Sequence, residues 1–446
     1  MKTLWLATGL LIVFNVNGQR IQDLLRQAES SYPLLKAKAF EVQAGKSNVS
    51  SAKSAALPTL DAAYQVNYAT GNNITGMVST QFIMPMTGPP SPGNDYGGVY
   101  GSAGGLLLNW EPFTFGQRSA RIDVARANLQ FNEADAKQET FKHQINVINS
   151  YLDVLMAHEL LKVHSKNLER SKENVRVVHT LTMAGLRPGV DTALFKAELS
   201  RAKIDMLNQS KFLETQRAGL AELLATKNLT YSYDSSYFHT LPVFPEDTAS
   251  SVHPIVALSQ SKLEINQNQR TYVQRSLYPK LTAWGTTYAR GSGIHYDGTV
   301  NSKDGLSFSR YNYGVGLQLS VPLLRFVDVR NQLHQQNALI NSQQERLKQV
   351  ELDLEKQRVV ADLTLRNSLE IAQETPVLYE SAELGYQSLL TRYNAGMTNY
   401  ADLVQAQYGL VKAETDLKKS YLECWKALLY EAAVHGDLNV FLKQVN

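Results

Sequence analysis

One long segment of the chain, residues 118–184, keeps a helical pattern of apolar and polar positions without interruption. It contains neither glycine nor proline. Its apolar residues recur at i, i+3, i+7 and i+10, the spacing of a seam that faces a partner helix. This spacing is seen at Ile145, Ile148, Leu152 and Leu155. As one helix the segment would be about 100 Å long, which predicts an elongated coiled coil rather than an ordinary globular core.

Four shorter segments predict β-strands because apolar and polar residues alternate along them. They lie at about residues 59–70, 99–111, 280–290 and 309–321, and the third alternates poorly. Strands with one apolar face, which carries tyrosines at its outer end, and one polar face are typical of membrane β-barrels. The apolar face is clearest at Tyr311, Tyr313, Val315, Leu317, Leu319 and Val321. Four strands cannot close a barrel, which needs about eight, so several chains would share one.

The same arrangement occurs twice along the chain. A second long helical segment, residues 330–395, follows the second pair of strands, and the two long segments end at Gly185 and Gly396. Glycine ends helices because it adopts a left-handed conformation at little cost. A return helix is predicted after each turn, at residues 189–227 and 398–435.

An offset of 211 residues aligns the two return helices and defines an internal repeat. The aligned pairs include Asp191 with Asp402, Leu199 with Leu410, and Asp205 with Asp416. Pro376 has no counterpart in the first repeat, and we expect it to break a hydrogen bond and kink the second long helix. The predicted organisation is repeat 1 at 19–227, a linker at 228–251, repeat 2 at 252–435 and a tail at 436–446.

Each repeat also has a shorter helical segment between two prolines, at residues 33–58 and 254–279. A return helix of about 57 Å and a shorter helix of about 38 Å together match one long helix. Each repeat is therefore expected to form two helical columns, one continuous and one broken, attached to a two-stranded hairpin.

The N-terminal segment, the hydropathy, the net charge and the cysteine content narrow the class of protein further. Residues 1–18 have the charged start, apolar centre and small-residue end of a signal peptide. No later apolar run is long enough for a helical membrane span, and the mean hydropathy is −0.26. A net charge of +3 does not favour a nucleic acid as partner. The single cysteine, Cys424, continues a seven-residue spacing from Leu403, which predicts a buried seam position.

With these features the chain resembles the TolC-like outer-membrane efflux proteins. The resemblance rests on the duplicated order, on Asn-Trp-Glu-Pro-Phe at 109–113 followed by Gly116, and on Tyr-Asn-Ala-Gly-Met at 393–397 leading into Asp402. It implies an α+β membrane protein: a homotrimer whose twelve-stranded β-barrel, four strands from each chain, continues into a long periplasmic α-helical coiled-coil barrel.

The resemblance also implies a function. Such a protein is the exit duct of a tripartite efflux or type I secretion system, set in outer-membrane lipid of a Gram-negative-type cell and projecting into the periplasm. Its partners are a periplasmic adaptor and an inner-membrane pump. It implies no catalysis in this chain, no cofactor and no metal.

Two kinds of site follow from the resemblance. The turns that would meet the adaptor are Met183, Ala184, Gly185 and Leu186 in the first repeat and Asn394, Ala395, Gly396 and Met397 in the second. Asp402 matches an aspartate of the periplasmic constriction, where three copies would form an acidic ring, and the repeat adds Asp191 as its equivalent. Gln405 and Thr398 stand where the family has a second aspartate and a gate-locking arginine. We therefore expect a weaker or differently built latch.

Simpler interpretations stand beside these. Gly185 and Gly396 could serve only to end helices, and Asn399 and Asp402 have the spacing of a helix cap. His158, Glu159 and His164 are spaced as solvated residues rather than as metal ligands. A secreted coiled-coil structural or adhesive protein without a pore is the alternative function, but it would leave the apolar strand faces exposed to water.

Overall fold

The computed structural model describes residues 21–72, 93–227, 233–245 and 252–445. The signal peptide expected at residues 1–18 and parts of the linker at 228–251 lie outside these residues. The chain falls into two compact units, which are described separately. Unit 1 comprises residues 1–42, 132–260 and 345–446, and unit 2 comprises residues 43–131 and 261–344.

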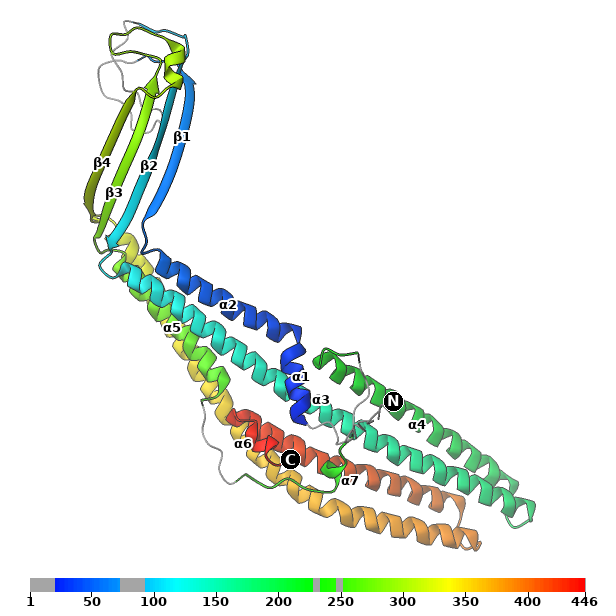
Figure 1. The fold of residues 1–446 in the computed structure, drawn as a ribbon. Helices are drawn as coiled ribbons and strands as arrows, with labels where there is room; N and C mark the ends of the chain where they lie inside the picture. The colour runs from blue at the N-terminus through cyan, green and yellow to red at the C-terminus, as the bar shows by residue number, and fades with distance from the viewer. Residues whose placement is uncertain (1–20, 73–92, 228–232, 246–251, 446) are drawn as a thin grey trace, which may run out of the picture. The chain divides into compact units, whose positions relative to one another are not determined.

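Unit 2 contains a four-stranded antiparallel sheet with the strand order β1-β2-β3-β4 (Figure 1). The four segments predicted from alternation each overlap one of these strands. Since β2 pairs with β3, the two repeats meet in the middle of the sheet, and β1 and β4 are its edges. The strands are β1 (Thr59–Ala69), β2 (Val99–Phe113), β3 (Lys280–Ser292) and β4 (Arg310–Ser320).

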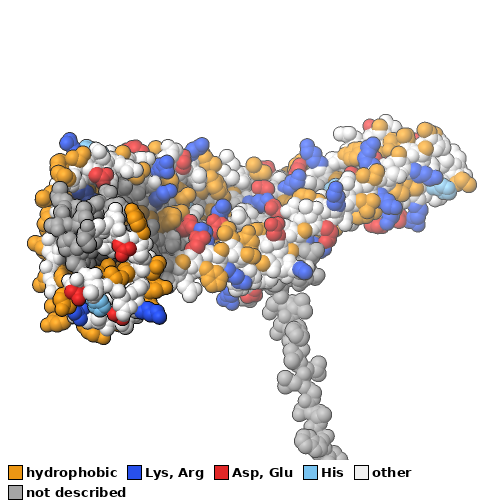
Figure 2. Space-filling model, turned by 90° about the horizontal axis from the view of Figure 1, so that it is seen from above, with side chains coloured by type: hydrophobic (Ala, Val, Ile, Leu, Met, Phe, Trp, Pro, Cys, Tyr) orange, Lys and Arg blue, Asp and Glu red, His pale blue; other side chains and the backbone are white. Residues whose placement is uncertain are grey.

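The register gathers the apolar residues on one face of the sheet. Directly opposed residues share a face, and the pairs Leu60 with Leu108 and Ala283 with Leu317 are of this kind. On β4 the apolar side chains are 73–88% exposed from Tyr313 to Leu317. Hydrophobic side chains border the sheet-bearing end at the left of Figure 2, whereas charged residues of both signs intermingle on the helical part.

The poor alternation of β3 has a structural reason. Trp284 and Tyr288 lie on the polar face of the sheet, because Trp284 is opposite Gly316 and Tyr288 is opposite Asn312. The apolar-face positions of β3 carry small residues such as Ala283 and Gly285. Large rings on the polar face and small residues on the apolar face weaken the alternation of apolar and polar residues in the sequence. They do not change the pairing of the strands.

The long helices have nearly the predicted extents. Helices α3 and α6 have 67 and 69 residues, respectively. No helix among the described residues combines the length and apolarity needed to span a membrane. Helix α1 was not predicted, and it buries Leu24 and Leu25 in the core. The helices are α1 (Ile21–Ser31), α2 (Pro33–Ser54), α3 (Gln117–Met183), α4 (Gly189–Leu223), α5 (Pro254–Arg275), α6 (Phe326–Asn394), α7 (Tyr400–His435) and α8 (Asn439–Leu442), with short 3-10 turns at Ser236–Phe238 and Ser302–Leu306.

The core of unit 1 is formed largely by α1, α3 and α7. The predicted seam of α3 lies in it: Ile148, Leu152 and Leu155 are fully buried and Ile145 packs against them. Cys424 on α7 is also buried, as predicted, and its Sγ lies 3.1 Å from the carbonyl of Ser368 on α6. Burial raises the pKa of this thiol to about 12, so it is an unreactive packing residue.

Pro376 does not interrupt α6. A proline has no N–H, so the carbonyl of Ala372 loses its helical donor. The hydroxyl of Thr375 lies 3.3 Å from that carbonyl and is the replacement donor. Thr375 Oγ1 is also 2.7 Å from Ser420 Oγ on α7, and both residues are buried. The break expected from the sequence is therefore compensated by a hydroxyl chain that joins the two helices.

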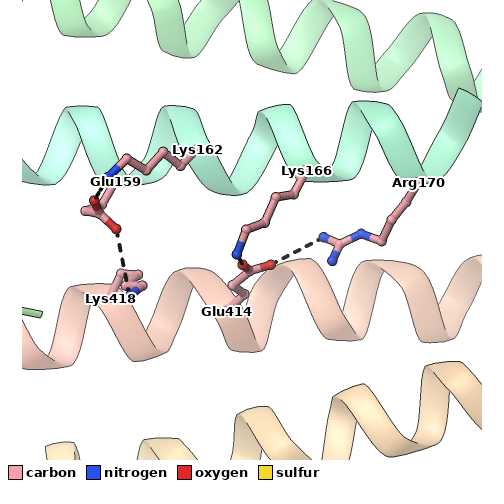
Figure 3. A network of polar contacts seen from close by, with 6 residues as sticks. All are labelled: Glu159, Lys162, Lys166, Arg170, Glu414 and Lys418. Carbon is pink, nitrogen blue, oxygen red and sulfur yellow. Dashed lines mark hydrogen bonds and ion pairs between the residues drawn. The ribbon is translucent and has the colours of Figure 1, made fainter. Parts of the chain in front are cut away.

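Buried polar residues join α3 to α7 along their length (Figure 3). Glu414 of α7 accepts hydrogen bonds from Lys166 at 3.1 Å and from Arg170 at 3.3 Å. Glu159 of α3 pairs with Lys162 at 2.5 Å and Lys418 at 3.8 Å. Removal of one partner of such a buried pair would leave an uncompensated charge, so these contacts favour a single register of the two helices.

The interpretation of His158, Glu159 and His164 as solvated residues is wrong. Glu159 is buried in the ion pairs above. The ring of His158 stacks on Tyr233 with the centroids 3.7 Å apart. Both histidines are half-buried. The charged partner of Glu159, Lys418, lies in the other repeat, which local spacing does not reveal.

Candidate functional site

The α3–α4 and α6–α7 turns have the same backbone geometry. Gly185 and Gly396 both adopt positive φ, 73° and 79°. The N–H of Leu186 donates to Leu181 O at 2.9 Å, and the N–H of Met397 donates to Arg392 O at 2.8 Å. These are the bonds of a glycine-terminated helix end. The role of the two glycines in ending helices is thus present in the structure.

The predicted tip residues form the surface of these turns. All of them are exposed, and Met183, Leu186 and Met397 present large apolar side chains. Two exposed apolar turns on one unit are a surface that a protein partner could cover. The eight residues are Met183, Ala184, Gly185 and Leu186, and Asn394, Ala395, Gly396 and Met397.

An arginine connects the two turns. Arg187, just after the first turn, lies with its guanidinium 4.1 Å from the ring centroid of Tyr393. Its Nη2 donates to the carbonyl oxygen of Tyr393 and, at 3.2 Å, to that of Thr398. A planar guanidinium can stack on a ring and donate in its own plane at the same time. Arg187 therefore holds the end of α6 and the start of α7 from the other repeat.

Asp191 and Tyr393 form the second link between the turns. The hydroxyl of Tyr393 donates to Asp191 Oδ2 at 3.0 Å, and both residues are buried. Burial, followed by the hydrogen bond to Asp191, raises the pKa of Tyr393 above its usual range. The phenol is therefore protonated, and remains a donor, throughout the physiological pH range.

Aromatic residues support this link from α4 and α7. The ring of Phe195 packs edge-on against Tyr393 and against Tyr400, with centroids 5.6 Å and 4.8 Å apart. The hydroxyl of Tyr400 donates to Leu194 O at 3.2 Å. These contacts belong to a small core separate from the main one. The two turns are thus fixed to each other by both polar and apolar contacts.

Asp402 has a different environment from Asp191. It is exposed, its N–H donates to Asn399 Oδ1 at 2.9 Å, and its Oδ2 accepts from the hydroxyl of Thr398 at 2.8 Å. Asn399 is the N-cap of α7. Asp402 therefore takes part in the helix cap, and its outer carboxylate surface stays open to solvent. Gln405 lies one turn further along α7 and is also exposed.

The structure thus brings Thr398, Asp402 and Asp191 into one small region, and it adds two residues that were not predicted. Arg187 and Tyr393 were missed because their contact joins segments more than 200 residues apart. A signal was present: the repeat offset aligns Arg187 with Thr398, the position at which the family has its arginine. The described residues contain no group of three or more His, Cys, Asp or Glu that could hold a metal ion.

Solved structures with the same fold are known. The chain is similar to CusC, a transmembrane channel, with a TM-score of 0.77 and 12% identity, covering 94% of this chain and 92% of that one. It is similar to the outer membrane protein VceC of Vibrio cholerae, with a TM-score of 0.74 and 15% identity, covering 94% and 96%. At such identities the likeness shows the fold alone.

Sequence relatives and a family model extend the comparison. The chain is 21% identical over 305 residues to the cobalt-zinc-cadmium resistance protein CzcC of Cupriavidus metallidurans, covering 67% of this chain and 68% of the relative. It is 24% identical over 335 residues to the pyoverdine export outer membrane protein OpmQ of Pseudomonas aeruginosa, covering 72% and 67%. The model of the outer membrane efflux proteins matches residues 24–226 and 249–423. The chain belongs to the outer membrane efflux protein family.

Proposed function

We propose that this protein is the outer-membrane exit duct of a tripartite efflux or type I secretion system and that it works as a homotrimer. The observation that carries the proposal is the sheet of unit 2, which has one exposed apolar face and two unpaired edges, β1 and β4. An apolar face of this kind suits outer-membrane lipid. Open edges suit pairing with further copies, because three sheets joined edge to edge would give twelve strands.

The helices would continue the duct into the periplasm. In this arrangement α3 and α6 are the long columns, and the turns that follow them lie at the periplasmic end. The exposed apolar residues Met183, Leu186 and Met397 support the docking of a periplasmic adaptor there, together with an inner-membrane pump. The chain carries out no reaction and needs no cofactor; it supplies a path for the cargo.

The proposed gate is the cluster between the turns. Arg187 and the Tyr393–Asp191 bond hold the two helical hairpins of one chain together, which supports a closed state. Arg187 supplies, from the first repeat, the cation that the second repeat lacks at Thr398. We assign Asp402 and Gln405 to the constriction of this duct, where three copies of Asp402 would form an acidic ring that favours cations.

Conductance across planar lipid bilayers tests the proposal. The full-length protein, extracted in detergent, should run as a trimer in native mass spectrometry and should produce discrete channel openings in bilayers. A product that is monodisperse without detergent and produces no openings would instead support the secreted coiled-coil alternative, because that class has no need of lipid.

A further inference from the structure

Two arginines face each other on the polar side of the sheet. Arg290 on β3 is directly opposite Arg310 on β4, and both are exposed. They lie at the end of the strands that is joined by the 293–309 connection rather than at the end that leads to the helices. Like charges directly opposite each other on neighbouring strands repel. An anion bound beside the two guanidinium groups would relieve this repulsion.

The described residues do not supply this negative charge. Among them, no carboxylate forms an ion pair with either guanidinium: Arg310 donates to the carbonyl of Ser309 at 2.9 Å, and Arg290 lies 6.0 Å from the ring centroid of Tyr288. In the 293–309 connection, Oδ2 of Asp304 already contacts Nε2 of His295 at 3.0 Å. The sequence of residues 73–92, which lie outside the described part, contains no aspartate or glutamate.

The nearest acidic residue on the same face of the sheet is distant. Gln65, Ala103 and Arg290 lie in one row across the strands. Asp61 is four residues before Gln65 on β1, so it lies about 16 Å from Arg290 by strand rise and spacing. This exceeds the Debye length of about 8 Å at physiological salt. At the other end of β3, by contrast, Lys280 is paired with Glu111 at 3.7 Å.

One aromatic ring lies beside the arginines on the same face. Tyr288 is two residues before Arg290 and is 38% exposed. A Cβ at Gly105, the residue opposite Tyr288 on β2, would be 2.7 Å from Cβ of Tyr288. Glycine at this place lets the tyrosine lie close to the backbone of β2, with part of its ring exposed to solvent. Trp284 is six residues before Arg290, about 20 Å along the strand, and lies outside this group.

We propose that Arg290, Arg310 and Tyr288 form a binding site for anionic aromatic solutes on the polar face of the sheet. Guanidinium groups bind carboxylate, sulfonate or phosphate oxygens with two parallel hydrogen bonds. The exposed phenol ring of Tyr288 offers a stacking surface beside them. The inference rests on the proposed function in one respect: the polar face lines the duct, so each chain would contribute one such site near the outer end.

Probe binding tests the site itself. Pyrenetetrasulfonate is titrated with the full-length protein in a neutral detergent, and its fluorescence anisotropy is read. The double variant Arg290→Gln/Arg310→Gln should bind at least tenfold more weakly than the wild type. The matched control is Lys280→Gln/Arg330→Gln, which removes the same charge from unit 2 at the other end of β3 and on α6, and should bind as the wild type does. Absence of binding by the wild type, or equal loss in the control, would overturn the proposal.

Two further measurements separate the parts of the inference. Tyr288→Leu should weaken binding of pyrenetetrasulfonate about fivefold and leave the affinity for methanesulfonate, tested as a competitor, unchanged, whereas Trp284→Leu should change neither. An unchanged affinity of Tyr288→Leu for the pyrene probe would show that the ring is not part of the site. In bilayers, the arginine double variant should shift the reversal potential towards cations. If the wild type conducts and the variant has the same reversal potential, the site lies outside the conducting path. If no protein conducts, the proposed function fails while probe binding still reports on the site.

Discussion

The turns at the ends of α3 and α6 have the same backbone and different chemistry. Both place a glycine at positive φ and close with the same hydrogen bonds. The offset that aligns them also aligns Arg187 with Thr398 and Asp191 with Asp402. Yet Arg187 and Asp191 reach across to Tyr393, whereas Thr398 and Asp402 bind each other within their own helix start.

This difference shows that the two copies of a duplicated helical hairpin can take different structural roles. The backbone of the turn is set by glycine and survives the divergence of the two repeats. The side chains just after it are free to change, so one copy provides the contacts between hairpins and the other provides a helix cap with an exposed carboxylate. The comparison can be tested by changing equivalent positions in the two repeats.

The largest expected effect is at the first aligned pair. Arg187→Ala removes the stacking on Tyr393 and two hydrogen bonds. Because the arginine is half-exposed, we expect the closed state to lose about 2 kcal/mol of stability relative to the open state. Single-channel recordings should show an open probability about 30-fold higher. Thr398→Ala is the matched control: Arg187 binds the backbone carbonyl of residue 398, so the open probability should change less than threefold. Equal effects of the two variants would contradict an arginine latch.

The second expected effect concerns the Tyr393–Asp191 bond. Tyr393→Phe and Asp191→Ala should each raise the open probability about tenfold, because each removes a buried hydrogen bond of about 1–2 kcal/mol. The double variant should raise it little further, because both single variants remove the same bond. Additive effects in this cycle would show that the two side chains act independently.

The pH dependence of the same bond has a definite sign. The pKa of Tyr393 is raised in the folded state, so its contribution is fully present below the unfolded value of about 10 and is lost as pH rises through the folded value. Wild-type open probability should therefore show no step from Tyr393 between pH 6 and 9. A step in that range that disappears in Tyr393→Phe would contradict this assignment.

A smaller effect is expected at Asp402. Asp402→Lys should reduce the cation selectivity of the channel, read from the reversal potential in a KCl gradient. The control Glu423→Lys makes the same charge change at another exposed position of α7, about 30 Å further along the helix, and should leave the potential unchanged. If Asp402→Lys behaves as the wild type does, Asp402 serves the helix cap alone and no acidic ring exists.

Much of the architecture could be predicted from the sequence because its elements follow strict periods. The seam through Ile148 and Leu152 repeats every seven residues, and β4 alternates at every second residue, so local patterns sufficed. β3 resisted prediction because Trp284 occupies the polar face, where Gly316 makes room for it. Helix α1 was missed because its 11 residues are too short to establish a period clearly.

The candidate site was less predictable than the fold. Contacts such as Arg187 with Tyr393 and Glu159 with Lys418 join residues from different repeats, and no local spacing encodes them. Pro376 was expected to break a hydrogen bond of α6 and to kink the helix. The replacement donor for the carbonyl of Ala372, the hydroxyl of Thr375, depends on side-chain geometry that the pattern does not contain. Residues that act within one turn, such as Asn399 and Asp402, were found from spacing alone.

The smallest expected difference is between the two glycines, and it tests the claim that the turns share one backbone. Gly185→Ala and Gly396→Ala each place a Cβ on a residue with positive φ, which costs about 1–2 kcal/mol. In neither case would the Cβ meet an atom within 4 Å, so backbone strain is the only cost and the two values should agree within about 0.5 kcal/mol. Hydrogen exchange at the amides that follow each glycine measures both local opening free energies in one protein preparation. A clearly larger loss at Gly396 would show that the second turn is held by contacts beyond its own backbone, and the division of roles between the repeats would then extend to the turn itself.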